Sequence, residues 1–121
     1  MTLTASPAGD SPSLPGPPAF LVLVDVTSAR ITVRGELDRP HAHQLIEAVG
    51  MVGRSAAPEW AIDASGITFC DAGGLRALLQ ANEMAVRTGH TLVIARPSRI
   101  VSRLLALVRP EGLPVPEDQQ A

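Results

Sequence analysis

The spacing of apolar residues changes several times along the chain, and each change predicts a new element. Residues 20–26 (FLVLVDV) form an apolar, largely β-branched run that is typical of a strand. Residues 30–35 alternate, with Ile31 and Val33 on one face and arginine or threonine on the other. Residues 27–29 (TSA) separate the two segments and predict a turn, so we expect a β-hairpin.

An amphipathic helix is predicted after the hairpin. Pro40 suits the first turn of a helix, and Asp38 or Arg39 stands near the N-cap position. Gly53 is a suitable C-terminal end. The apolar residues between these ends recur at helical spacing, at Ala42, Leu45, Ile46, Val49 and Val52.

The middle of the chain predicts a short strand, a loop and a second helix. Residues 60–64 form an apolar run that is too short for a helix, so we expect a strand. Residues 65–74 (SGITFCDAGG) are predicted to be a loop. Gly89 suits the C-terminal end of the following helix, whose apolar residues are Leu75, Leu78, Leu79, Ala85 and Val86.

A last strand and helix complete the pattern. Residues 91–95 (TLVIA) predict a buried strand, Ser98 is the expected N-cap of a third helix, and Pro110 stops that helix. Its apolar stripe is Ile100, Val101, Leu104, Leu105 and Val108. The order β-β-α-β-α-β-α predicts an α/β domain with a mixed sheet of about four strands covered by three to four helices.

The ends of the chain differ in composition from the region between them. Residues 1–19 are rich in Pro, Ser and Gly and lack an apolar period, which predicts a disordered tail. We expect one domain over residues 20–113 and a flexible tail over residues 114–121. A total of 121 residues suits a single domain.

Composition argues against nucleic acid and membrane partners. The formal net charge is −2, and the ten basic residues are spread along the chain and form no basic patch. Aromatic residues make up only 2% of the chain, too few for a platform on which bases stack. There is one cysteine, no signal peptide pattern and no apolar run of the ~18 residues that suggest a membrane span, so we expect a cytoplasmic protein.

No set of residues assembles into a catalytic or metal site. His41 and His43 are two positions apart and point to different sides of a helix, so we expect surface histidines. Cys70 lacks a recognisable partner and is expected to be a small buried apolar residue. Gly73 and Gly74 are not followed by the lysine of a phosphate-binding loop, which favours tight turn geometry. We therefore expect no enzyme activity, no cofactor and no metal.

Two aspartates each precede a predicted helix. Asp38 follows the second strand, and Asp71 precedes the helix that starts near Ala72. Aspartate is a favoured N-cap residue, so capping is the expected role for Asp38, while capping and contact with a partner are both open for Asp71.

Three segments resemble the STAS domain (sulfate transporter and anti-sigma factor antagonist). Residues 35–38 (GELD) resemble the turn between the second strand and first helix of that family. Residues 62–75 (IDASGITFCDAGGL) are similar to its pattern of a strand, S-G-V-T-F-x-D-S-S-G-L and a helix, and residues 97–105 resemble its last helix. The resemblance implies the same fold and a protein-binding function: free-standing members bind ATP-dependent anti-sigma factor kinases, and phosphorylation of a serine or threonine in the D-S-S-G segment releases them.

This chain departs from the family pattern at the phosphoacceptor. Ala72 stands at that position and Gly73 at the second serine, so neither residue carries a hydroxyl. We therefore expect constitutive binding of an anti-sigma factor kinase. The resemblance places the contacts at Asp71, Ala72, Gly73, Gly74, Leu75 and Arg76, with Asp38 and the start of the first helix beside them. Ser65 and Thr68 are the remaining hydroxyls of this segment, and Ser65 is expected to serve the local backbone.

Two other functions stay open from the resemblance. Some family members are small cytosolic subunits of lipid-transporting ABC complexes, and the missing phosphoacceptor does not distinguish this role from the first. Others are thought to bind nucleotides, although this chain holds no phosphate-binding loop or dinucleotide motif.

Overall fold

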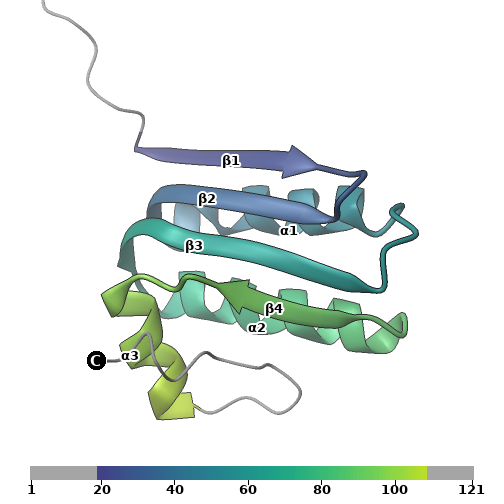
Figure 1. Cartoon of the computed structure of the whole chain (residues 1–121). Coiled ribbons are helices and arrows are strands. Elements are labelled where there is room, and N and C mark those ends of the chain that lie inside the picture. Colours follow the sequence, from purple (N-terminus) through teal and green to yellow (C-terminus); the bar gives the residue numbers. More distant parts are fainter. Residues whose placement is uncertain (1–18, 109–121) are drawn as a thin grey trace, which may run out of the picture.

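The computed structural model describes residues 19–108 and contains the expected α/β fold (Figure 1). A mixed sheet of four strands carries three helices in the order β-β-α-β-α-β-α, with one short 3₁₀ turn, η2, before the first helix. The predicted tails lie outside the described residues, apart from Ala19, and so does Pro110. The elements are β1 (Phe20–Asp25), β2 (Arg30–Leu37), η2 (Arg39–His41), α1 (Ala42–Val52), β3 (Glu59–Cys70), α2 (Ala72–Arg87), β4 (Thr91–Ala95) and α3 (Arg99–Val108).

The sheet has the strand order β1-β2-β3-β4. The hairpin strands β1 and β2 are antiparallel, whereas β2 pairs in parallel with β3, and β3 with β4. Parallel neighbours need a crossover, which α1 and α2 supply. These two helices run side by side along the sheet in Figure 1, while α3 contacts β3 and α2.

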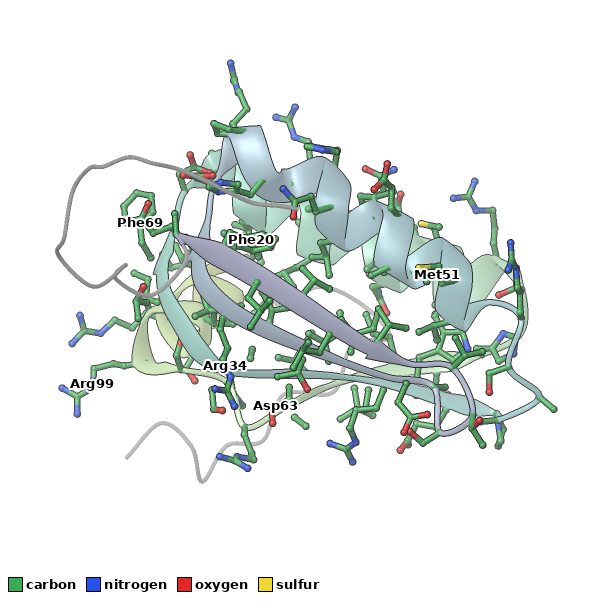
Figure 2. The ribbon with its side chains drawn as sticks, turned by 90° about the horizontal axis from the view of Figure 1, so that it is seen from above. Phe20, Arg34, Met51, Asp63, Phe69 and Arg99 are labelled. Carbon is green, nitrogen blue, oxygen red and sulfur yellow. The ribbon has the colours of Figure 1, made fainter. Side chains whose placement is uncertain are left out.

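Within residues 19–108, the helices α1 and α2 cover one face of the sheet and form the core with it, whereas the other face carries partly or fully exposed residues. Alternate residues of each strand point beneath the helices, and the fully buried ones include Ile31, Val33, Leu37, Ile62, Ile67, Leu92 and Ile94. Figure 2 shows Arg34 and Asp63 on the opposite side of the sheet from α1. A partner that binds the helices therefore contacts the face of the domain formed by α1 and α2.

The predicted loop over residues 65–74 is wrong except at Asp71, because β3 continues to Cys70 and α2 already begins at Ala72. Two register shifts, between Thr32 and Arg34 and between Gly35 and Glu36, each give β3 one extra residue opposite β2. Gly66 resembles a turn residue in the sequence, but a Cβ there would lie 2.7 Å from the Arg34 Cγ. The glycine marks a close approach between strands rather than a turn.

The helix ends follow the expectations except at Ser98, and one residue of the apolar stripe predicted for α2, Val86, is exposed. Gly89, with φ +82°, follows α2, and Asp38 caps η2, which contains Pro40. Val86 is 55% exposed, because it lies on the outer face of α2. The Ser98 hydroxyl has no hydrogen-bond partner within residues 19–108, so its side chain does not cap α3. No helix in this range has the length and apolar character that crossing a membrane requires.

Candidate partner-binding site

The ends of two neighbouring strands bring the predicted site residues together. β2 and β3 are parallel, and their last registered pair is Leu37 with Cys70. Asp38 and Asp71 follow these residues, so both lie at the same edge of the sheet. They begin η2 and α2, respectively. Both aspartates cap helices, as the sequence predicts.

Asp71 holds two helix starts at once. Its Oδ1 accepts a hydrogen bond from the Gly74 N–H at 2.8 Å, and its Oδ2 accepts one from the Arg39 N–H at 3.3 Å. The hydrogen bond from Gly74, together with those from Arg39 and Gly73 and the charge of Arg39, keeps the pKa of Asp71 below its ordinary value despite some desolvation. This carboxylate is ionised at neutral pH and fixes the N-terminus of α2 beside η2.

Asp38 is engaged with a histidine. Its Oδ1 accepts a hydrogen bond from the His41 N–H at 3.3 Å and lies 2.7 Å from His41 Nδ1. The His41 ring stacks on Phe20, with centroids 4.9 Å apart and an interplanar angle of 9°. The expectation of a surface histidine is wrong for His41, which is half-buried, while His43 is exposed. Asp38 therefore stabilises η2, which lies beside the site, and does not line the groove itself.

The two glycines at the start of α2 permit close packing. A Cβ at Gly74 would collide with the carbonyl oxygen of Leu37, and a Cβ at Gly73 would lie 3.0 Å from the Arg39 Cα. Gly74 is buried, so it offers no surface to a partner. Tight geometry, rather than a phosphate cradle, explains this glycine pair.

The accessible surface at this edge is a groove of about 550 Å³ between the starts of α1 and α2. Three of the predicted site residues line it, namely Ala72, Gly73 and Arg76. Asp38, Asp71, Gly74 and Leu75 do not appear in its lining. The remaining walls include the start of the first helical segment, which was expected beside the site, and further residues that the sequence did not single out. They are Arg39, Ala42, His43, Ile46, Glu47, Ala77 and Gln80.

The charged residues that line the groove carry a net positive charge. Arg39 and Arg76 are exposed and line it with Glu47 as the single carboxylate among the lining residues. Ala72 is exposed at the first position of α2. An anion at this position would face the amide groups of a helix N-terminus, where negative charge is favoured.

Phe69 is an exposed aromatic residue at the end of β3. It lies two residues before Asp71 and is 49% exposed. In Figure 2 its side chain projects from this end of the sheet. The sequence alone gives no role to Phe69, because residues 65–70 resemble a loop and their alternation as a strand is not apparent.

The other candidate side chains of this segment are occupied or buried. The Ser65 hydroxyl donates to Asp63 Oδ1 at 2.8 Å, and Thr68 lines a separate hollow with Arg34 and Gly66. Cys70 is buried, as expected, and desolvation, with Asp71 nearby, raises the pKa of its thiol to about 11. Residues 19–108 contain no group of three or more His, Cys, Asp or Glu side chains placed to hold a metal.

Comparison with known proteins identifies the family of this domain. The sequence model described as "Mlab, STAS domain" matches residues 23–115, so the chain belongs to the STAS domain family. No curated protein sequence gives a significant match.

Solved structures of anti-sigma factor antagonists share the fold. An antagonist from Mycobacterium paratuberculosis is 28% identical, with a TM-score of 0.59 over 88% of this chain and 95% of that one. Unphosphorylated SpoIIAA is 19% identical, with a TM-score of 0.56 over 84% of this chain and 91% of that one. The phosphorylated Bacillus SpoIIAA is 18% identical, with a TM-score of 0.52 over 84% and 95%.

Proposed function

We propose that this chain is a protein-binding regulator of the anti-sigma factor antagonist type, with no catalytic site of its own. Its partner is an ATP-dependent anti-sigma factor kinase, which binds over the groove between α1 and α2. The observation that carries the proposal is the position of Ala72. This residue is exposed at the mouth of the groove, where the family resemblance places the phosphoacceptor.

The lack of a hydroxyl at Ala72 makes binding constitutive. In an antagonist with serine at this position, phosphorylation adds about −1.5 to −2 charges at neutral pH. The N-terminus of α2 tolerates that charge, because its amide groups and dipole favour anions. The charge therefore acts on the interface with the partner more than on the fold. Ala72 cannot accept a phosphoryl group, so this release step is missing.

The exposed residues around Ala72 define the contact surface. Arg39, His43 and Glu47 stand on one side, with Arg76 and Gln80 on the other. Asp71 and Gly74 act beneath this surface by fixing the start of α2 against η2. The likeness to the Mycobacterium paratuberculosis antagonist, at 28% identity over most of both chains, supports the same class of partner.

A capture experiment with matched variants tests the proposal. Wild type, Ala72→Asp and Ala56→Asp are each used as bait in native lysate, and captured proteins are identified by mass spectrometry. Ala56 is exposed in the segment after α1, so it controls for an added charge away from the groove. We expect wild type and Ala56→Asp to capture an ATP-binding anti-sigma factor kinase and Ala72→Asp to lose it.

Other outcomes would contradict the proposed partner or the proposed interface. Recovery of the permease and ATPase of a lipid transporter would replace the kinase with the alternative partner expected from the family. Kinase capture that is insensitive to Ala72→Asp would place the interface elsewhere. A rise in the melting temperature with ATP or GTP would instead favour the nucleotide-binding alternative.

A further inference from the structure

The outer edge of β1 has no strand beside it within residues 19–108. β1 is the first strand in the sheet order, and Figure 1 shows no labelled element beyond it. Its register with β2 runs from Phe20 to Asp25 without a bulge. The strand (FLVLVD) has no proline or lysine and only one charge, at its end. Natural edge strands are commonly protected by proline, by lysine and other charged residues, or by bulges. Because β1 lacks a bulge and has a charge only at its end, its edge is open to strand addition.

Two hydrogen bonds show which backbone groups of β1 face outward. The Ala61 N–H donates to the Ala29 carbonyl at 2.9 Å, so that carbonyl faces β3. The Glu36 N–H donates to the Ala19 carbonyl at 2.8 Å, so Glu36 faces β1. Because these groups alternate along a strand, even-numbered residues of β2 face odd-numbered residues of β1. The N–H and C=O groups directed outward are therefore those of Phe20, Val22 and Val24.

We propose that this edge pairs with the same edge of a second copy of the chain, antiparallel and centred on Val22. In this register Val22 faces Val22 of the second copy, Phe20 faces Val24, and Leu21 faces Leu23. All three outward-facing residues of each strand then exchange backbone hydrogen bonds. The Leu21–Leu23 pairs fall at non-hydrogen-bonded positions, where side chains approach most closely. Leu23, which is 52% exposed in the single chain, becomes covered.

The side chains favour a second copy as the occupant, since every facing pair in this register is apolar. A shift of two residues pairs Val22 with Val24 but places Asp25 opposite Leu21 and leaves Phe20 unpaired. In the register centred on Val22, Asp25 lies outside the paired segment and stays beside Arg30 of β2. No residue that lines the groove belongs to β1, so this pairing is independent of kinase binding.

Sedimentation velocity of the full chain and two double variants tests the pairing. Leu21→Glu with Leu23→Glu places carboxylates opposite each other across the interface. Leu21→Glu with Leu23→Lys places opposite charges there. Both variants lose the same two leucines, and both keep a glutamate beside Arg34 of β2. We expect wild type and the Glu/Lys variant to be dimers at a concentration where the Glu/Glu variant is monomeric, a difference of at least tenfold in the dissociation constant.

A monomeric wild type, or the same oligomeric state for both double variants, overturns the proposal. Hydrogen exchange of the wild type gives a second measurement that does not depend on either variant folding. The amides of Val22 and Val24 should become protected as the concentration rises and the dimer forms. Protection that is already complete in a monomer would mean that another segment of the chain covers this edge, which also overturns the proposal.

Discussion

The side chain of Asp71 accepts a hydrogen bond from the backbone N–H of Arg39, over 3.3 Å, and so joins the starts of two helical segments that are far apart in sequence. The same carboxylate caps α2 through Gly74. Both walls of the candidate groove therefore depend on one ionised side chain. This relationship makes the shape of the groove sensitive to the charge of Asp71.

Replacing that charge should make the domain less stable in a pH-dependent way. Asp71→Asn keeps one acceptor oxygen but turns an amide N–H₂ towards one of the two donors, so we expect a lower urea midpoint at pH 7. The pKa of Asp71 is lowered on folding, so its stabilising contribution is present above the ordinary value of 3.8 and is lost as the pH falls through the lower pKa of the folded state. The difference between wild type and variant should shrink over that range. Fluorescence of Trp60, the single tryptophan, follows the unfolding; a difference that is constant down to pH 3 would contradict the role of the charge.

Two glycine-to-alanine changes should have opposite signs. Gly74→Ala forces a methyl group against the Leu37 carbonyl, and we expect a loss of about 1–3 kcal/mol in unfolding free energy. Gly50→Ala, on the exposed face of α1, meets no atom within 4 Å and should add about 0.5–1 kcal/mol. Urea denaturation of both variants measures the contrast. A neutral Gly74→Ala would show that α2 does not need its close approach to β2.

Cys70 should be unreactive in the folded protein. Burial and the neighbouring Asp71 raise the pKa of its thiol to about 11, so almost no thiolate forms at pH 8. We expect iodoacetamide labelling at pH 8 to be slow and to accelerate with urea along the unfolding curve. The unfolded chain in urea provides the control rate, and fast labelling of the native protein would contradict the burial of this side chain.

Phe69 should contribute to partner binding without contributing to stability. Phe69 is 49% exposed and lies two residues before Asp71, and large aromatic side chains often dominate interface energies. Phe69→Ala should weaken binding of the captured kinase at least tenfold while leaving the urea midpoint nearly unchanged. Val86→Ala removes an exposed apolar side chain from the other end of α2 and is the matched control. Equal affinities for both variants would exclude Phe69 from the interface.

Much of the fold could be predicted because its elements obey local periods. The stripe from Ala42 to Val52 and the run TLVIA correspond to α1 and β4, and both expected aspartate caps are present. The second half of β3 could not be predicted, because Ser65 and Gly66 resemble a turn. Their place in a strand depends on the register shifts against β2, which no local pattern encodes.

Individual residues of the site could be predicted mainly on one of its two sides. The resemblance directs attention to residues 71–76, of which Ala72, Gly73 and Arg76 line the groove. The opposite wall has Arg39 in η2 and His43 and Glu47 in α1. The start of this helix is expected beside the loop, but the side chains that line the groove are not, because α1 approaches α2 through the crossover topology. That approach follows from parallel pairing of β2 with β3, so spacing within either helix does not reveal it.

The measurement that tests the central claim most directly is binding of the captured anti-sigma factor kinase to wild type and Ala72→Ser, with and without ATP. Ala72 is exposed, so a serine hydroxyl fits there without repacking. Wild type should gain no phosphate by intact mass and stay bound when ATP is present, whereas Ala72→Ser should gain one phosphate on this residue and be released. Phosphorylation and release of wild type, or no phosphorylation of Ala72→Ser, would contradict the account.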